Sequence, residues 1–185
     1  MDHLGTIELE TERLLLRKFQ IDDAPTMYQN WTSDEAVTKY LTWPTHQSLQ
    51  DTQDYVNFCI SSYDNPQSYR WLIIEKDSQQ PIGDISVVSI EDKTKTAGLG
   101  WVLARQHWGK GYMPEAANTV LDYLFEQVGF NRIYAVHDSQ NPQSGRVMEK
   151  IGMTYEGTMR QAGCNNRGHV DLKMYAILKE DRKSR

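Results

Sequence analysis

Seven segments of the chain carry the pattern of a β-strand, in which apolar and β-branched residues alternate with polar ones or form short runs. Turn-forming residues separate neighbouring runs: residues 79–81 contain a proline, and residues 91–95 are polar. This pattern predicts strands at residues 13–19, 69–75, 82–90, 96–103, 132–137, 154–159 and 170–178.

Four further segments repeat apolar residues at helical spacing and predict helices at residues 22–30, 48–62, 114–127 and 143–151. Asp22 or Asp23 can cap the first helix. Gly129 and Gly152 follow the last two helices and are typical helix stops.

The order of these elements is strand, two helices, three strands, helix, strand, helix, two strands. A polar connection at residues 163–169 joins the last two strands. Such mixing indicates an α/β fold with helices layered on a sheet. The length of 185 residues and the lack of repeats or linkers predict a single domain over residues 1–185.

The segment around residues 96–127 predicts a binding site for an anion. A strand leads into a loop with two glycines, Gly109 and Gly111, and a helix begins directly afterwards. The first turn of a helix has unpaired N–H groups and a partial positive charge, and the glycines allow the backbone to approach a ligand closely. A diphosphate fits such a loop, but the sequence is neither a Walker A motif nor the G-x-G-x-x-G dinucleotide motif.

The loop spacing Q-x-x-G-x-G, from Gln106 to Gly111, resembles the acetyl-CoA loop of the GNAT superfamily of N-acetyltransferases. Further matches follow in the order expected for its ribosomal-protein N-terminal acetyltransferase branch. They are Glu10-Thr-Glu-Arg-Leu-Leu-Leu-Arg17 with Asp22-Asp-Ala24, then Trp108-Gly-Lys-Gly-Tyr112 with Glu115-Ala116, and finally Asn141-Pro-Gln-Ser144 with Glu149-Lys-Ile-Gly152.

The resemblance implies a mixed central sheet of about six to seven mostly antiparallel strands, flanked by about four helices. It implies an enzyme that transfers an acetyl group from acetyl-CoA to a primary amine. A protein N-terminal α-amine, such as that of a ribosomal protein, is the first choice of acceptor. A small-molecule amine (polyamine, amino sugar or antibiotic) is the alternative, and a non-catalytic acyl-CoA-binding module is a second one.

The resemblance also assigns cofactor contacts. The strand before the loop splays from its neighbour in this family, so the backbone there should bind the pantetheine arm. For Trp108 and Asn141 a structural role, in packing or in starting a turn, is the alternative. The predicted cofactor-binding residues are Trp101, Val102, Leu103, Gln106, His107, Trp108, Gly109, Lys110, Gly111, Tyr112, Asn141 and Ser144.

The chain departs from the family at two catalytic positions. Many relatives have a glutamate where this chain has Gly98, and a tyrosine acid where it has Met148. Ser144 therefore becomes the predicted proton donor, and Glu91 the predicted general base. Asp138 and Asp171 are alternative bases, and a bound water with an already neutral amine is a further alternative.

The acceptor pocket is expected between the early helices and the last hairpin, with Trp31, Trp43 and Asp171 as substrate-binding residues. For each tryptophan, packing of a helix on the sheet is the alternative. A homodimer is left open, because no residue pattern specifies an interface.

Composition narrows the partners further. The net charge is −5, and the only basic run is the tail at residues 182–185, which argues against nucleic acid as a partner. The chain has no apolar run of membrane length and no secretory signal, and its two cysteines form no C-x-x-C pair, so a cytoplasmic protein is expected. The five histidines show no metal-ligand spacing, so no metal site is predicted.

Overall fold

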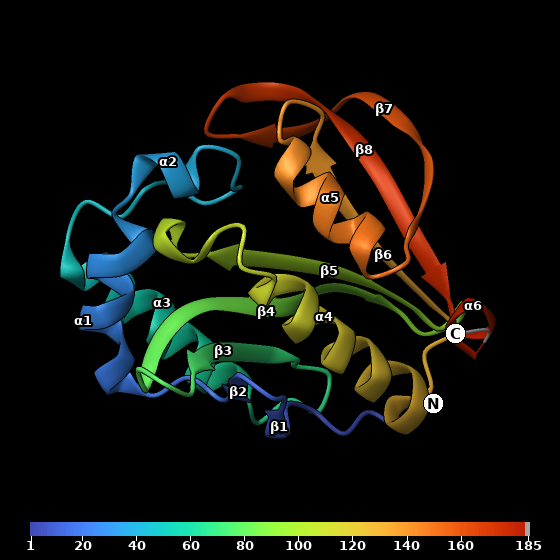
Figure 1. Ribbon diagram of the computed structural model, residues 1–185, viewed down its shortest axis with the longest axis horizontal. Helices are drawn as coiled ribbons and strands as arrows, with labels where there is room; N and C mark the ends of the chain where they lie inside the picture. Colours follow the sequence, from blue (N-terminus) through green and yellow to red (C-terminus); the bar gives the residue numbers. More distant parts are fainter. Residues whose placement is uncertain (184–185) are drawn as a thin grey trace.

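A computed structural model describes residues 1–183, so the end of the basic tail, residues 184–185, lies outside the described residues. One sheet of eight strands runs through the molecule in the order β1-β2-β3-β4-β5-β6-β8-β7 (Figure 1). Neighbouring strands are antiparallel except β5 and β6, which are parallel. The strands are β1 (Leu9–Glu10), β2 (Leu14–Arg17), β3 (Arg70–Glu75), β4 (Gln80–Glu91), β5 (Thr96–Leu103), β6 (Arg132–Asp138), β7 (Thr154–Asn165) and β8 (Gly168–Leu178).

The helices occupy both faces of the sheet (Figure 1). The α-helices are α1 (Ala24–Met27), α2 (Glu35–Thr38), α3 (Leu49–Ser62), α4 (Tyr112–Tyr123), α5 (Pro142–Lys150) and α6 (Lys179–Lys183). Single turns of 3-10 or π-helix are η1 (Ile21–Asp23), η2 (Tyr28–Thr32), η3 (Arg105–His107) and η4 (Leu124–Val128).

The mixed α/β architecture and the order of the seven predicted strands and four predicted helices are confirmed. The sheet has eight strands rather than six to seven, because β1 is a two-residue strand that pairs with β2 and is too short to show a periodic pattern. The one-turn helix α2 and the terminal helix α6 were also not predicted.

Two local predictions differ from the structure. The expected polar connection at residues 163–169 is mostly strand, since β7 ends at Asn165 and β8 begins at Gly168. Its residues are polar because this end of the hairpin is largely exposed, which removes the alternation of a half-buried strand. Asp23 occupies the N-cap position of α1, but its carboxylate accepts no hydrogen bond from that helix; it binds Arg17 and, in a capping box at the start of η1, the backbone N–H of Gln20.

Two apolar cores hold the layers together. The first lies between the sheet and the helices α4 and α5, where Val120, Leu121 and Phe125 pack against strand residues such as Leu99 and Ile133. The second lies on the opposite face and packs η2, α1 and α3 against β3 and the end of β5. The predicted helix at residues 114–127 therefore buries the face that its spacing indicated.

The sheet opens between β5 and β6, and this opening positions the site. The two strands pair only from Thr96 with Arg132 to Leu99 with Ala135. Beyond that point residues 100–103 of β5 remain paired with β4, while residues 136–138 of β6 remain paired with β8. The strands diverge there (Figure 1), so one edge of β5 has no strand beside it.

Candidate active site

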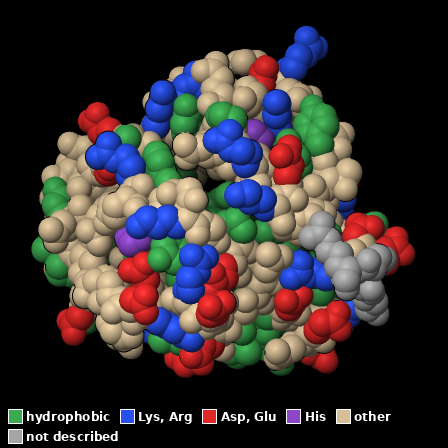
Figure 2. Space-filling model, in the orientation of Figure 1, with side chains coloured by type: hydrophobic (Ala, Val, Ile, Leu, Met, Phe, Trp, Pro, Cys, Tyr) green, Lys and Arg blue, Asp and Glu red, His purple; other side chains and the backbone are tan. Residues whose placement is uncertain are grey.

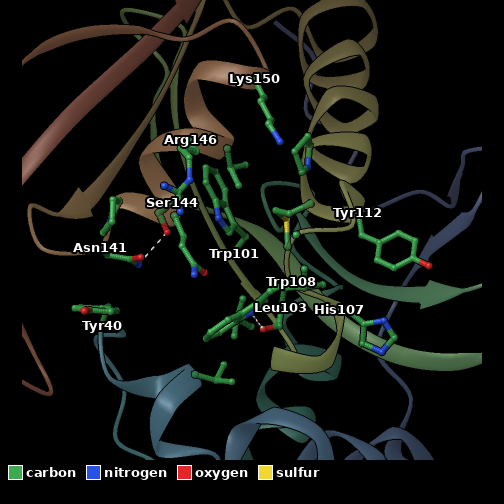
Figure 3. Close-up of a pocket in the computed structure, with 18 of the residues that line it drawn as sticks. Tyr40, Trp101, Leu103, His107, Trp108, Tyr112, Asn141, Ser144, Arg146 and Lys150 are labelled. Atoms are coloured by element: carbon green, nitrogen blue, oxygen red, sulfur yellow. Dashed lines mark hydrogen bonds between the residues drawn. The ribbon is translucent and has the colours of Figure 1, made fainter.

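A cavity of about 540 Å³ lies at the gap between β5 and β6. Helix α2 with the segment after it forms one wall, and α5 forms another; the end of β5, the following loop and the start of α4 complete the lining. Figure 2 shows a hollow on this face with Lys and Arg side chains gathered around it, and Figure 3 shows the lining side chains. The predicted cofactor loop and the predicted second cofactor segment thus meet in one cavity.

The backbone of β5 presents hydrogen-bonding groups to the gap at alternate residues. The N–H of Ala104 donates to the carbonyl of Ile82 on β4 at 2.8 Å. Because backbone groups alternate in direction along a strand, Val102 also faces β4, whereas Trp101 and Leu103 face the gap. Val102 lines the cavity, but its backbone N–H and carbonyl face β4, so this geometry does not support a contact between its backbone and the cofactor, and the contact stays a prediction.

Trp108 completes this edge of the cavity. Its indole Nε1 donates to the carbonyl of Leu103 at 2.7 Å, so at Leu103 only the N–H remains for a ligand (Figure 3). The half-buried ring also packs against the second core. Trp101, in contrast, keeps both its N–H and its carbonyl directed to the gap.

The loop after β5 has the backbone shape of an anion-binding turn. Gly109 and Gly111 have φ angles of +75° and +80°, which residues with a Cβ atom rarely adopt. We find no hydrogen bond from the N–H groups of residues 109–111 to any described residue. Together with the first N–H groups of α4 they offer several donors to an anion. The side chains of Gln106 and Lys110 do not line the cavity.

His107 and Tyr112 connect the two ends of the loop to Glu75 on β3. Tyr112 donates its hydroxyl to the carboxylate of Glu75 on β3, and Nδ1 of His107 lies 3.8 Å from the same carboxylate. Burial lowers the pKa of His107, although Glu75 partly opposes this, so the ring is neutral near pH 7. Its buried Nδ1 has no hydrogen-bond partner among the described residues.

Helix α5 supplies the opposite wall. Asn141 precedes the helix and donates Nδ2 to Oγ of Ser144 at 3.0 Å (Figure 3). Arg146 and Lys150 line the same cavity one and two turns further on. Neither cation was among the residues predicted from the sequence. Their spacing of four residues, which places both on one face of a predicted helix, was a signal that could have found them.

Comparison with known proteins identifies the family. A family model described as "Acetyltransferase (GNAT) domain" matches residues 13–154. The chain belongs to the GNAT acetyltransferase family. This acetyltransferase is 31% identical over 173 residues to the uncharacterized N-acetyltransferase p20 of Bacillus licheniformis, covering 94% of this chain and 97% of that protein.

Other relatives have named acceptors. The ribosomal-protein-serine acetyltransferase of Escherichia coli is 29% identical over 139 residues, covering 75% of this chain and 76% of that protein. The spermidine N(1)-acetyltransferase of Vibrio cholerae is 26% identical over 133 residues, covering 72% of this chain and 75% of that protein. A solved structure of RimL, a ribosomal L7/L12 alpha-N-protein acetyltransferase, in complex with coenzyme A shares the fold, with a TM-score of 0.83, 23% identity, and coverage of 93% and 98%.

The acetyl donor of this acetyltransferase is acetyl-CoA, as in its family. The cavity fits that molecule. The loop with Gly109 and Gly111 offers N–H donors for a diphosphate, and Arg146 and Lys150 offer positive charge beside it. The free backbone groups of Trp101 can pair with the amides of the pantetheine arm. The predicted cofactor is thereby confirmed, while the individual contacts stay predictions.

Glu91 cannot act as the base of this acetyltransferase. It pairs with Thr96 at the end of β4 that is remote from the gap, and it accepts a hydrogen bond from the N–H of Lys93. At about 3.3 Å per strand residue, Thr96 lies roughly 17 Å from Trp101. The sequence already contained this signal: the predicted turn at residues 91–95 places Glu91 beside the start of β5, and the cofactor loop follows the other end of that strand.

Asp138 lies beside the gap but is fully engaged. Its buried carboxylate accepts from Asn165 Nδ2 at 2.9 Å, from the N–H of Gln140 at 2.8 Å and from Arg167 Nη1 at 2.8 Å. Burial favours the neutral acid, but these hydrogen bonds hold the pKa of Asp138 below its ordinary value. Asp171 accepts from the N–H of Gln161 at 2.8 Å and does not line this cavity, so the geometry does not support its predicted contact with the acceptor or its alternative role as the base, and both stay predictions.

The two departures from the family have physical reasons. A Cβ atom at Gly98 would lie 2.5 Å from Oγ of Ser89 and 2.8 Å from Cζ of Tyr134, whose hydroxyls bond each other at 2.8 Å. The glutamate of the relatives therefore has no room. Met148 is 1% exposed and packs in the first core. An apolar side chain suits this buried position, and it offers no hydroxyl for the acid role of the relatives' tyrosine.

The predicted acceptor tryptophans are wrong. Trp31 is fully buried in the second core, and Trp43 stacks on Tyr55 without lining the cavity. Packing of the early helices on the sheet, the alternative stated above, is their role. Tyr40 lines the cavity instead, opposite Asn141 and Ser144 (Figure 3).

Two further features to consider in residues 1–183 are a membrane-spanning helix and a metal site. No helix in this range has both the length and the apolar character needed to cross a bilayer. In the same range, no three His, Cys, Asp or Glu side chains come together in a way that could hold a metal ion.

Proposed function

We propose that the enzyme transfers the acetyl group to the α-amine of a protein N-terminus, such as that of a ribosomal protein, by direct attack in a ternary complex. The observation that carries the proposal is the gap between β5 and β6. The cavity at this gap takes lining residues from α4 and α5 on one side and from α2 on the other. Donor and acceptor can therefore meet there without a covalent enzyme intermediate.

The chemistry needs little help from a base. A peptide α-amine has a pKa of about 8, so a useful fraction is already neutral near pH 7, whereas a lysine or polyamine nitrogen, with a pKa of about 10.4, is almost fully charged. This matches a site whose three predicted carboxylate bases are remote or already engaged. The N–H groups of Trp101 and Leu103 that face the gap are candidates to stabilise the oxyanion.

The predicted role of Ser144 as proton donor becomes that of a hydrogen-bond donor to the leaving thiolate, which takes its proton from solvent. Its Oγ accepts a hydrogen bond from Asn141 at 3.0 Å, which leaves its own proton free to point into the cavity. A serine hydroxyl donates a hydrogen bond rather than a full proton at neutral pH, so its contribution is stabilisation of the thiolate.

The charge of the cavity supports an N-terminal amine over a polyamine. Among the described residues that line it there is no Asp or Glu, whereas Lys39, Arg146 and Lys150 are present. A polyamine carries several positive charges and would find no carboxylate to bind them. A peptide N-terminus carries one positive charge and loses it before attack.

The test is release of coenzyme A thiol from acetyl-CoA with a panel of acceptors, alongside calorimetric binding of coenzyme A. We expect turnover with peptides that have a free N-terminus and none with the same peptides acetylated at the N-terminus. Preferential turnover of spermidine or an amino sugar would replace the peptide with a small-molecule acceptor. Tight coenzyme A binding without thiol release on any amine would indicate a non-catalytic acyl-CoA-binding module.

A further inference from the structure

Arg13 connects the start of β2 to the cofactor loop and to α4, although it does not line the cavity. Its Nη1 donates to the carbonyl of Lys110 at 3.0 Å. Its Nε donates to Oε2 of Glu115 at 2.7 Å, and Nη2 lies 2.6 Å from the same oxygen. The guanidinium also lies over the ring of Tyr112, 4.3 Å from the centroid. One side chain thus contacts the loop and the first turn of α4 together.

The contact with Lys110 fixes the direction of a backbone donor. In a planar trans peptide the carbonyl of one residue and the N–H of the next point in opposite directions. Since the Lys110 carbonyl points to Arg13, the N–H of Gly111 points away from it. Gly111 itself lines the cavity, and we find no acceptor for its N–H among the described residues. Arg13 therefore holds a donor available on the ligand side of the loop.

The contact with Glu115 removes an electrostatic conflict. A carboxylate in the first turn of a helix stabilises that helix, but it also repels an anion bound at the same helix end. Glu115 is drawn away by Arg13, by the N–H of residue 13 at 3.0 Å and by the hydroxyl of Thr11 at 2.6 Å. These partners compensate its charge, so the positive end of α4 remains available to a diphosphate.

We propose that Arg13 is a positioning residue for the donor: it holds the loop and the start of α4 in the form that binds the diphosphate of acetyl-CoA. It acts through the Lys110 carbonyl and the Glu115 carboxylate rather than by touching the ligand. The role needs the forked guanidinium, because an ammonium group has no planar set of donors to reach both acceptors at once.

The experiment compares ligands with and without the diphosphate. Dissociation constants of coenzyme A, dephospho-coenzyme A and pantetheine are measured by calorimetry or NMR titration for the native protein, Arg13→Lys and Arg13→Ala. We expect both variants to weaken coenzyme A and dephospho-coenzyme A by about tenfold or more, the scale of a lost charge-assisted hydrogen bond. Pantetheine, which lacks the diphosphate, should bind with an unchanged constant.

Arg17→Lys is the matched control. Arg17 lies at the other end of β2 and forms a comparable ion pair with Asp23, with Nη2 2.7 Å from Oδ1, but it does not contact the loop. It should lower thermal stability without changing the ratio of coenzyme A to pantetheine affinity. Arg13→Lys keeps the positive charge, so it still tests the proposal if Arg13→Ala does not fold. Equal weakening of all three ligands, or an equal ratio change in Arg17→Lys, would reduce Arg13 to a general structural role and overturn the proposal.

Discussion

At the scale of single residues, the cofactor loop depends on backbone conformations that its glycines permit. Gly109 lines the cavity at φ +75°, and a Cβ built there would meet no protein atom within 4 Å. The packing of the loop itself therefore does not require glycine at this position. What requires it is the left-handed conformation, together with the space that a ligand must occupy.

Gly109→Val is expected to abolish acetyl-CoA binding while the circular dichroism spectrum stays nearly native. Valine disfavours the left-handed conformation by about 1–2 kcal/mol, and its side chain occupies cavity space. Calorimetry with coenzyme A measures the loss. Gly129→Val, at a helix end with φ +91° and outside the cavity, introduces the same strain and should leave binding intact. Native-like affinity in Gly109→Val would remove the loop from the site.

A second residue-scale feature is a buried carboxyl group that no ion pair compensates. Asp84 on β4 is 6% exposed, and burial raises its pKa from 3.8 to about 7, although Arg70 opposes the shift. The unfolded chain releases this proton at lower pH than the folded protein does. The native carboxyl group therefore lowers stability progressively as the pH rises from about 4 to 7, and the loss is constant above that.

Asp84→Asn keeps the shape of the protonated acid and cannot ionise. Its free energy of unfolding should match the native protein near pH 4 and exceed it increasingly up to pH 7, by up to about 4 kcal/mol at ~1.4 kcal/mol per pKa unit. Urea unfolding at a series of pH values measures this difference. The exposed Asp64→Asn should show no such trend. A pH-independent difference for Asp84→Asn would mean that the carboxyl group is ionised throughout.

At the scale of elements, α5 combines packing and binding on its two faces. Gly145 and Met148 are buried toward the sheet, while Arg146 and Lys150 line the cavity. We find no ion-pair partner for either cation within residues 1–183. Uncompensated positive charge on the cavity side of a helix is suited to the phosphate groups of the donor.

The double variant Arg146→Glu with Lys150→Glu is expected to weaken coenzyme A binding more than about tenfold at low salt, with a smaller loss at high salt because ions screen the interaction. Calorimetry at two ionic strengths measures both effects. Lys18→Glu with Lys93→Glu makes the same change of charge at exposed positions outside the cavity. A comparable loss in that control would indicate an effect of net charge alone.

At the scale of the whole molecule, the β7–β8 hairpin closes one end of the site. Its tip reaches the segment after α2, where Asn166 Nδ2 donates to the carbonyls of Thr38 at 2.9 Å and Trp43 at 2.8 Å. The neighbouring Arg167 binds Asp138 at the end of β6. The two contacts of Asn166 join segments more than a hundred residues apart beside the cavity wall that contains Tyr40.

Asn166→Ala should release this closure. Loss of two hydrogen bonds, one half-buried and one exposed, is expected to speed amide hydrogen exchange in residues 38–46 by about tenfold or more, without changing coenzyme A affinity. Exchange followed by mass spectrometry measures the effect. Asn65→Ala, whose side chain accepts from the N–H of Gln67 in another turn, should leave residues 38–46 unaffected. Unchanged exchange there in Asn166→Ala would mean that the hairpin does not hold the wall.

The sequence by itself determined the features that depend on local chemistry. Periodicity located the strands and the four longer helices, and the glycine spacing with the following helix located the cofactor loop, because turn geometry and helix ends are encoded within a few residues. The positions of Asn141 and Ser144 beside that loop followed from family motifs.

Only the tertiary structure decided which distant residues share the cavity. Trp31 and Trp43 were plausible site residues by type, but packing buries the first in the second core and stacks the second on Tyr55 outside the cavity. Arg146, Lys150 and Tyr40 enter the site because α5 and the segment after α2 face each other across the gap between β5 and β6. Register, the divergence of two strands and the packing of helices on a sheet are long-range properties, and no local pattern specifies them.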